Sequence, residues 1–217
     1  MSDPIENTPA FGYSMALNLN DQPCLVVGGG KVAVRKIQRL LAAGAAVVVI
    51  APDMDARILT MPAVQCLQRP FQIEDIANID PLLVILCSND KALHERTSAY
   101  CHAHRILVNV ADDRAQSTFI VQSSFQKEDL LVSVSTNGTN PGFAKYLREH
   151  LEASIDPQVL VAMEMLSRLR TDILTAVEGQ EQREAILRTI DIEALIAKLR
   201  ERPSSEVESE LRTCLFS

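Results

Sequence analysis

The first half of the chain alternates short, wholly apolar segments with longer segments that are hydrophobic at helical spacing. Wholly apolar runs are typical of strands buried on both faces of a parallel sheet. Helical patterns lie between several of these runs, from Lys31 to Gly44, over 54–61 and over 91–104. The alternation predicts an α/β fold built on a parallel sheet. The five predicted strands cover residues 24–27, 47–50, 64–67, 82–87 and 106–110.

The first predicted strand runs directly into three glycines, and a helix begins immediately after them. The spacing Gly28-x-Gly30-x-x-Ala33 fits the dinucleotide fingerprint, in which glycines allow a tight turn and the close approach of a diphosphate. The free N–H groups of the first helical turn would face the phosphates. We therefore predict a Rossmann-type domain that binds a dinucleotide; the alternative is a purely structural glycine turn. The predicted contacts here are Gly28, Gly29, Gly30, Lys31, Val32 and Ala33.

The segments that follow the second and fourth strands provide further candidate contacts, because doubly wound sheets bind ligands at the carboxyl ends of their strands. An acidic residue that holds the ribose is expected after the second strand, but the chain has Pro52 there. Asp53 is the nearest carboxylate; the alternative is that it only caps a helix. Ser88 and Asn89 begin a helix-capping turn after the fourth strand. All four residues are predicted to lie at the cofactor site.

Asp112 is the carboxylate most suited to catalysis. It follows the fifth buried strand at the edge that faces the predicted cofactor, where a proton acceptor would sit. The alternative is that Asp112 and Asp113 only cap a turn. The four histidines, at 94, 102, 104 and 150, show no ligand spacing, so we interpret them as surface residues and predict no metal site.

Beyond residue 113 the pattern changes to an antiparallel segment followed by helices. We predict three regions: a nucleotide-binding domain over 1–113, an antiparallel segment over 114–155 and a small helical domain over 156–217. Residues 1–15 are expected to form an irregular leader, with a short edge strand at 15–19. The later predicted elements are strands at 117–123 and 130–135, joined by a turn at 126–129, helices at 142–155, 157–177 and 181–202, and a loosely ordered tail from Pro203.

The composition argues against several classes of protein. The 217 residues are 47% hydrophobic with a net charge of −7, which argues against general nucleic-acid binding. No run is long enough to span a membrane, and the N-terminus lacks the layout of a signal peptide. The five cysteines form no CxxC pair, which indicates a reducing, cytoplasmic location.

Charge is unevenly distributed along the chain. Residues 149–217 contain 14 acids and 8 bases, whereas residues 31–52 contain four bases and no acid. Lys31, Arg35 and Arg39 share one face of the predicted helix by their i,i+4 spacing. Beside a phosphate site this face would attract anions; the alternative is a solvated helix face.

Four motifs, in order, resemble the siroheme synthase family, in its precorrin-2 dehydrogenase and sirohydrochlorin ferrochelatase unit. They are Gly-Gly-Gly-Lys-Val-Ala-Val-Arg-Lys at 28–36, Ala-Gly-Ala-Ala-Val-Val-Val-Ile-Ala-Pro at 43–52, Leu-Val-Asn-Val-Ala-Asp-Asp at 107–113 and Val-Ser-Thr-Asn-Gly-Thr-Asn-Pro at 134–141. The resemblance is close over residues 11–155.

The resemblance implies NAD-dependent oxidation of precorrin-2 to sirohydrochlorin, and in many members the insertion of ferrous iron as a second substrate. It implies a homodimer whose interface includes the antiparallel segment, and Asp112 as general base in both reactions. From the charge and the hydropathy we expect no nucleic-acid or membrane partner. Thr136 and Asn137 match the turn near the tetrapyrrole. Many members have serine and glycine there, and Gln122 stands where proline is usual; these departures affect the fine shape of the substrate cleft.

Two other functions remain open at the level of the sequence. One is an NAD(H)-sensing module, in which the acidic helices contact a protein partner and Asp112 has no role. The other is an NAD enzyme that acts on a small carbonyl, although no His or Lys is placed as its acid.

Overall fold

The computed structural model describes residues 12–216, which form two compact units. The sheet unit extends to Gln122 and also includes Thr136–Asn140, and the helical unit contains 123–135 and the residues from Pro141 onward. The division at residues 113 and 155 stays a prediction. The leader expected at 1–15 lies largely outside the described residues.

The sheet unit is built on five parallel strands in the order β3-β2-β1-β4-β5. Val27, at the end of β1, lies opposite Ile50 on one side and Leu86 on the other. The order of the strands reverses between β1 and β4, and such a switch point opens a crevice at the carboxyl edge. The strands are β1 (Pro23–Val27), β2 (Ala46–Ile50), β3 (Val64–Leu67), β4 (Leu83–Leu86) and β5 (Leu107–Val110).

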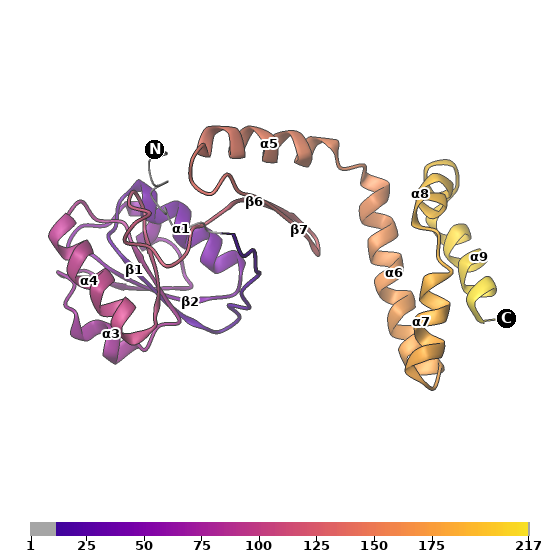
Figure 1. The fold of residues 1–217 in the computed structure, drawn as a ribbon, viewed down its shortest axis with the longest axis horizontal. Helices are drawn as coiled ribbons and strands as arrows, with labels where there is room; N and C mark the ends of the chain where they lie inside the picture. The colour runs from indigo at the N-terminus through magenta and orange to yellow at the C-terminus, as the bar shows by residue number, and fades with distance from the viewer. Residues whose placement is uncertain (1–11, 217) are drawn as a thin grey trace, which may run out of the picture. The chain divides into compact units, whose positions relative to one another are not determined.

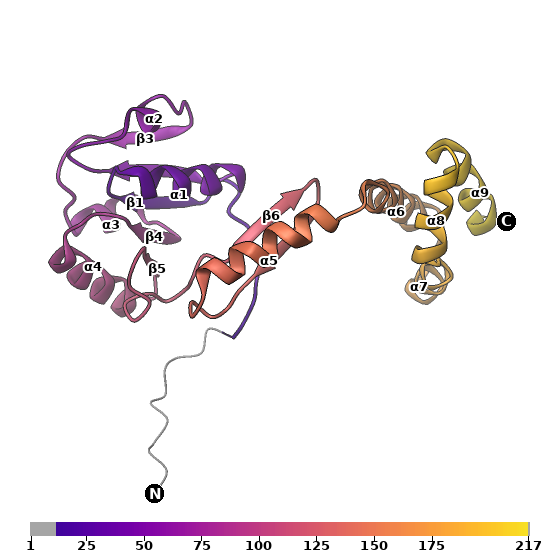
Figure 2. The ribbon, with the colours of Figure 1, turned by 90° about the horizontal axis from the view of Figure 1, so that it is seen from above.

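Helices cover both faces of this sheet (Figure 2). Side chains alternate between the two faces, so Val26 packs with α1 and α2 whereas Leu25 packs with α3 and α4. The side chains between the sheet and the helices on each face are buried. The thiol of Cys24 lies in the core on the α1 side, and that of Cys101 in the core on the α4 side. The helices are α1 (Lys31–Ala42), α2 (Ala56–Leu59), α3 (Glu74–Ile79) and α4 (Lys91–His104).

Several sequence predictions for the helices of this unit need correction. The helix expected at 54–61 is limited to α2, because the carboxylate of Asp55 accepts a hydrogen bond from the N–H of Arg57 and starts the helix there. The short helix α3 was not predicted. Apolar side chains of an amphipathic helix usually face the core, but Val32 of α1 is 38% exposed. Gly44 lies one place beyond the cap residue of α1, with φ +79°.

The strand predictions at the two ends of this unit also need correction. No strand forms at 15–19, and 117–122 is not a strand. Instead the latter segment runs beside β5, where the N–H of Thr118 donates to the carbonyl of Val108. The side chain of Thr118 in turn accepts from the N–H of Val108, so side-chain bonds replace a regular ladder.

The helical unit begins with a hairpin that packs against α5 (Pro141–Ser154) (Figure 1). The hairpin pairs β6 (Ser123–Lys127) with β7 (Leu130–Val134), and Lys127 lies opposite Leu130. The first strand was therefore predicted too early, at 117–123. A two-residue turn with Glu128 at φ +52° sets the observed register.

Four helices complete this unit around a core that includes Met165, Leu169 and Leu199. The helix expected at 181–202 is interrupted, because the carboxylate of Asp191 accepts from the N–H of Ala194 and starts a new helix. The tail expected from Pro203 is also helical. The helices are α6 (Pro157–Ala176), α7 (Gln180–Arg188), α8 (Ile192–Glu201) and α9 (Ser204–Phe216).

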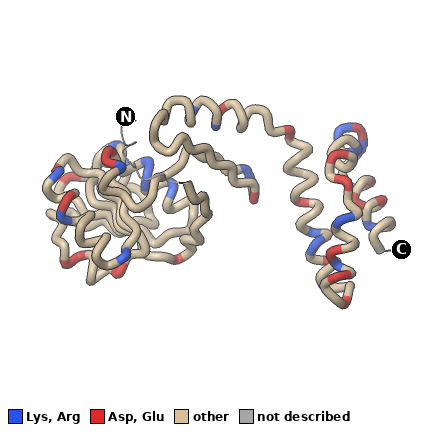
Figure 3. The backbone as a smooth tube through the Cα atoms, viewed as in Figure 1, with Lys and Arg blue, Asp and Glu red and all other residues tan. Residues whose placement is uncertain are grey.

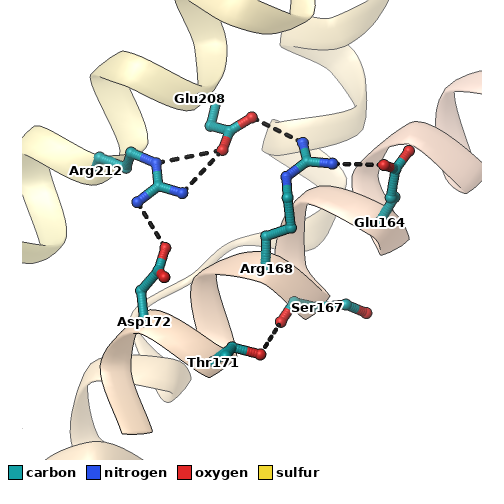
Figure 4. A network of polar contacts seen from close by, with 7 residues as sticks. All are labelled: Glu164, Ser167, Arg168, Thr171, Asp172, Glu208 and Arg212. Atoms are coloured by element: carbon teal, nitrogen blue, oxygen red, sulfur yellow. Dashed lines mark hydrogen bonds and ion pairs between the residues drawn. The ribbon is translucent and has the colours of Figure 1, made fainter. Parts of the chain in front are cut away.

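A network of ion pairs joins α6 to α9 (Figure 4). Glu208 accepts from Arg168 at 2.8 Å and from Arg212 at 3.1 Å. Arg168 also pairs with Glu164, and Arg212 with Asp172. Charges of both signs therefore alternate across this interface. None of the described helices is long and apolar enough to cross a membrane.

Candidate functional site

The residues predicted as cofactor contacts follow β1, β2 and β4 at the carboxyl edge of the sheet, and Asp112 follows β5. Parallel register places them along one line: the N–H of Gly28 donates to the carbonyl of Ile50, and the N–H of Cys87 donates to that of Val27. The N–H of Ala111 donates to the carbonyl of Leu86. The parallel sheet therefore brings together residues separated by more than 80 positions in the chain.

The three glycines differ in what surrounds them. Gly28 has φ +114°, and a Cβ there would lie 2.7 Å from the backbone of Cys87 and Ser88. A Cβ on Gly29 would lie 2.2 Å from the carbonyl oxygen of Asp53. A Cβ on Gly30 would meet no atom within 4 Å. The fold itself requires the first two glycines, whereas the space at the third is open for a ligand.

Gly30 also begins α1, with no side chain to cap it. The first N–H groups of the helix, from Lys31 to Ala33, have no partner within the helix and point out of its end. Ala33 is fully buried, so the helix lies close to the sheet. An open backbone cradle at a helix N-terminus fits a diphosphate. The geometry thus suits the dinucleotide predicted from the sequence.

The loop after β2 packs against the glycine turn, where the N–H of Asp55 donates to the carbonyl of Gly29 at 2.8 Å. Asp55 caps α2 and pairs with Arg57. Asp53 is exposed and does not cap the helix, so that alternative was wrong. Pro52 is also exposed at this edge. Asp53 therefore stays the candidate for the ribose.

After β4, the hydroxyl of Ser88 lies 2.9 Å from Nε2 of His94. His94 is only 3% exposed, so the prediction that all four histidines are surface residues was wrong for this one. Asp90 caps α4 by accepting from the N–H of Leu93, as the predicted turn requires. Asn89 is exposed beside it. The buried imidazole thus fixes the orientation of the Ser88 side chain.

Asp112 and Asp113 have different roles after β5. The carboxylate of Asp113 accepts from the backbone N–H groups of Ala115 and Gln116 and from the Gln116 side chain. Asp112 is exposed, and within residues 12–216 its carboxylate forms no hydrogen bond or ion pair. The turn-capping role therefore belongs to Asp113, and the Asp112 carboxylate is available to a ligand.

A partly buried lysine lies on the α1 side of this edge. Nζ of Lys36 donates to Oδ1 of Asn109, a residue of β5 that is 5% exposed, at 3.1 Å. The amide of Asn109 also donates to the carbonyl of Phe119 at 3.0 Å. Burial raises the pKa of the nearby Cys87 thiol to about 11; Lys36 opposes this shift and Asp112 adds to it. Cys87 is therefore close to both charges.

The predicted substrate residues lie in the loop that belongs to the sheet unit. Thr136 accepts from the N–H of Asn140 at 3.1 Å, so its hydroxyl also orders the turn. Asn137 has φ +52°, a conformation that asparagine tolerates better than most residues, which explains how it can replace the glycine of many members. A Cβ on Gly138 would lie 3.4 Å from the Arg114 side chain, so this loop approaches the segment that follows Asp112.

Sequence reasoning missed three residues of this edge: Lys36, His94 and Asn109. Asn109 was detectable, since it is the single polar residue of a buried strand. Lys36 lies on α1 next to the buried Ile37, and the buried side of α4 that carries His94 also contains Thr97 and Ser98, so hydrophobicity alone did not mark either position as buried. No group of three or more potential metal ligands is present among the residues that the structure describes.

Comparison with known proteins adds a family and a fold. Residues 15–123 match a family described as "Putative NAD(P)-binding". The chain is 34% identical over 207 residues to a siroheme synthase of Actinobacillus succinogenes, covering 92% of this chain and 43% of that protein. It is 37% identical over 161 residues to a siroheme synthase of Neisseria meningitidis, covering 73% of this chain and 33% of that protein.

Among solved structures, SirC, a precorrin-2 dehydrogenase, matches with a TM-score of 0.73 and 23% identity, covering 93% of this chain and all of that one. This likeness confirms the predicted fold class. The resemblance to siroheme synthases is also confirmed, although the chain spans less than half the length of these curated relatives.

Proposed function

We propose that this chain, which belongs to the NAD(P)-binding family matched by residues 15–123, is an NAD-dependent dehydrogenase that oxidises precorrin-2 to sirohydrochlorin. The observation that carries the proposal is an open cradle at Gly30 and, at the same edge of the sheet, the carboxylate of Asp112, which has no hydrogen bond or ion pair among the described residues. The chain that carries them is similar to siroheme synthases over most of its length. Such a site combines a place for a dinucleotide with a proton acceptor.

The residues that would hold the cofactor form three groups. Gly28–Ala33 would bind the diphosphate through backbone N–H groups, and Asp53 with Pro52 would border the adenosine ribose. Ser88 and Asn89 would contact the other half of the molecule, beyond the switch point. When bound, NAD supplies the acceptor for the hydride.

Asp112 would take the proton that the substrate loses as it gives up a hydride. The carboxylate is exposed at the end of β5 and keeps all its lone pairs available, which suits a general base. Thr136 and Asn137, in a loop of the same compact unit, would border the tetrapyrrole. Oxidation then balances as one hydride to NAD and one proton to Asp112.

The proposal also includes a second substrate, an oligomeric state and a location in the cell. Ferrous iron would be a second substrate of the same site, inserted as two pyrrole protons leave, with Asp112 again as base. The chain would act as a homodimer, with the hairpin and α5 in its interface. The five cysteines form no disulfide, which supports a cytoplasmic location.

An anaerobic assay with precorrin-2 and NAD tests the proposal, with NADH and the sirohydrochlorin spectrum followed together. Sirohydrochlorin should appear only when NAD is present. D112A and the isosteric D112N should lose turnover by at least about a hundredfold while keeping NAD affinity. E95Q, which removes an exposed acid on α4, is the matched control.

The outcomes separate the alternatives. NAD binding without NADH formation would replace the dehydrogenase with a sensing module. Loss of both turnover and NAD binding in D112N, or of neither, would refute the role given to Asp112. A spectral change on adding Fe²⁺, faster than the spontaneous rate, would establish chelation.

A further inference from the structure

Among the described residues, the basic residues of α1 form no ion pair, whereas several arginines of the C-terminal helices do. In the C-terminal helices, charges of both signs are interspersed (Figure 3), and Arg168, Arg202 and Arg212 all form ion pairs. Within residues 12–216, neither Arg35 nor Lys36 forms an ion pair. Unpaired cations that are partly buried cost free energy.

Lys36 is the more unusual of the two because its ammonium group is only partly exposed. Among residues 12–216 its one hydrogen bond goes to the neutral oxygen of Asn109, which leaves two N–H donors of the ammonium group without an acceptor in this part of the chain. Burial, together with the charges of Arg39 and Arg35, lowers the pKa of Lys36, and nearby Cys87 opposes the shift. Among the described residues this cation therefore has a neutral hydrogen-bond acceptor but no negatively charged partner, and a bound anion would supply one.

The position of Lys36 indicates which anion this would be. The diphosphate cradle lies at Gly30, between β1 and α1, and the ribose side lies after β2. The Lys36 ammonium instead reaches β5 at Asn109 and lies near Cys87, which follows β4. It is therefore on the side of the switch point that carries Asp112.

We propose that Lys36, assisted by Arg35, binds a carboxylate of the tetrapyrrole and thereby orients the ring against Asp112. This inference rests on the proposed function, whose substrate carries many carboxylates. Asn109 would act as a positioning residue, since its amide is fixed by Phe119 and points its oxygen at the ammonium group. The site would thus select polycarboxylate tetrapyrroles through a charge that is separate from the dinucleotide cradle.

Binding of sirohydrochlorin without NAD tests this inference directly, by anaerobic absorbance titration of the full chain. K36M should weaken binding by about ten- to a hundredfold, the range for a hydrogen bond to a charged group. K36R should recover most of the affinity because it keeps the charge. R96M, which removes an exposed cation of α4, should bind like the wild type.

Three further measurements exclude a merely structural role. The Kd for NAD, from calorimetry, should change by less than about twofold in K36M, and its melting temperature should stay within about 4 °C of the wild type. Added salt should weaken sirohydrochlorin binding more in the wild type than in K36M, because one ion pair is missing in the variant.

Failure of the role given to Lys36 can be distinguished from failure of the proposed function. If the wild type oxidises precorrin-2 and K36M binds sirohydrochlorin equally well, the role of Lys36 is refuted and the proposed function stands. If K36M loses NAD affinity instead, Lys36 serves the dinucleotide and the inference is wrong. If the wild type neither binds sirohydrochlorin nor oxidises precorrin-2, the proposed function fails and this inference fails with it.

Discussion

Replacing Gly30 with alanine should separate cofactor binding from folding. The backbone of Gly30, at φ −83° and ψ −173°, is open to any residue, and its Cβ would meet no atom within 4 Å. The variant should therefore lose only the preference of glycine over alanine at a helix start, about 0.5–1 kcal/mol. For a chain of this size, that is about 1–4 °C in melting temperature.

NAD affinity should respond far more strongly to the same change. The new methyl group would stand where the diphosphate approaches the backbone, so we expect the Kd for NAD to rise about a hundredfold, or about 2.7 kcal/mol. Calorimetric titration with NAD, beside thermal unfolding, measures both quantities.

Gly28 provides the matched contrast. In G28A the side chain would meet backbone atoms at 2.7 Å and the residue would keep φ +114°. Strain of about 1–3 kcal/mol and overpacking of about 1–3 kcal/mol should leave the chain strongly destabilised. A G30A protein with the melting temperature and the NAD affinity of the wild type would refute the assignment of Gly30 to the diphosphate cradle. A G30A protein that is unfolded would show that there is no room for a side chain at this position.

Three other predictions concern stability. D75N should cost about 1–3 kcal/mol in urea unfolding, because it removes the negative charge and one of the two oxygens that accept from Arg69. The bonds to Arg69 hold the pKa of Asp75 below its ordinary value, so the loss should shrink as pH falls below about 4. An equal loss at pH 7 and pH 2.5 would contradict this. M165A should lower the free energy of unfolding by about 2–5 kcal/mol in the same assay, since Met165 is fully buried between the C-terminal helices. NAD affinity should not change. A loss below about 1 kcal/mol would show that this core is loosely packed. E208Q should cost about 1 kcal/mol or less, with the difference vanishing in 1 M salt; a salt-independent loss would mean that Glu208 contributes through packing rather than charge.

The parallel sheet could be predicted from the sequence because its signals are local. Apolar runs, a glycine turn and the helical repeat of α1 each lie within a few residues, and α4 was predicted with its observed bounds. The candidate site followed from the same logic, since the carboxyl ends of parallel strands meet at one edge. The difference between Asp112 and Asp113 could not be predicted, because it depends on which carboxylate faces the turn at Ala115.

The errors occurred where side chains override the pattern. The apolar segment at 117–122 resembles a strand, but Ser117 and Thr118 satisfy the edge of β5 with their hydroxyl groups and leave no regular ladder. The break at Asp191 was hidden within a continuous helical repeat. Pro203 was interpreted as the start of a tail, but its carbonyl accepts from the N–H groups of Glu206 and Val207, so it immediately precedes the first turn of α9.

The burial of Cys24 and Cys101 and the partial burial of Cys87 determine how the protein reacts with oxidants and electrophiles. Burial raises the pKa of Cys24, Cys87 and Cys101 to about 11. At pH 7 such a thiol is ionised in about one molecule in ten thousand, and only the thiolate reacts readily with peroxide or alkylating agents. Cys214 is exposed on α9. A thiol-directed label should therefore mark the C-terminal helix first and leave the edge of the sheet chemically untouched.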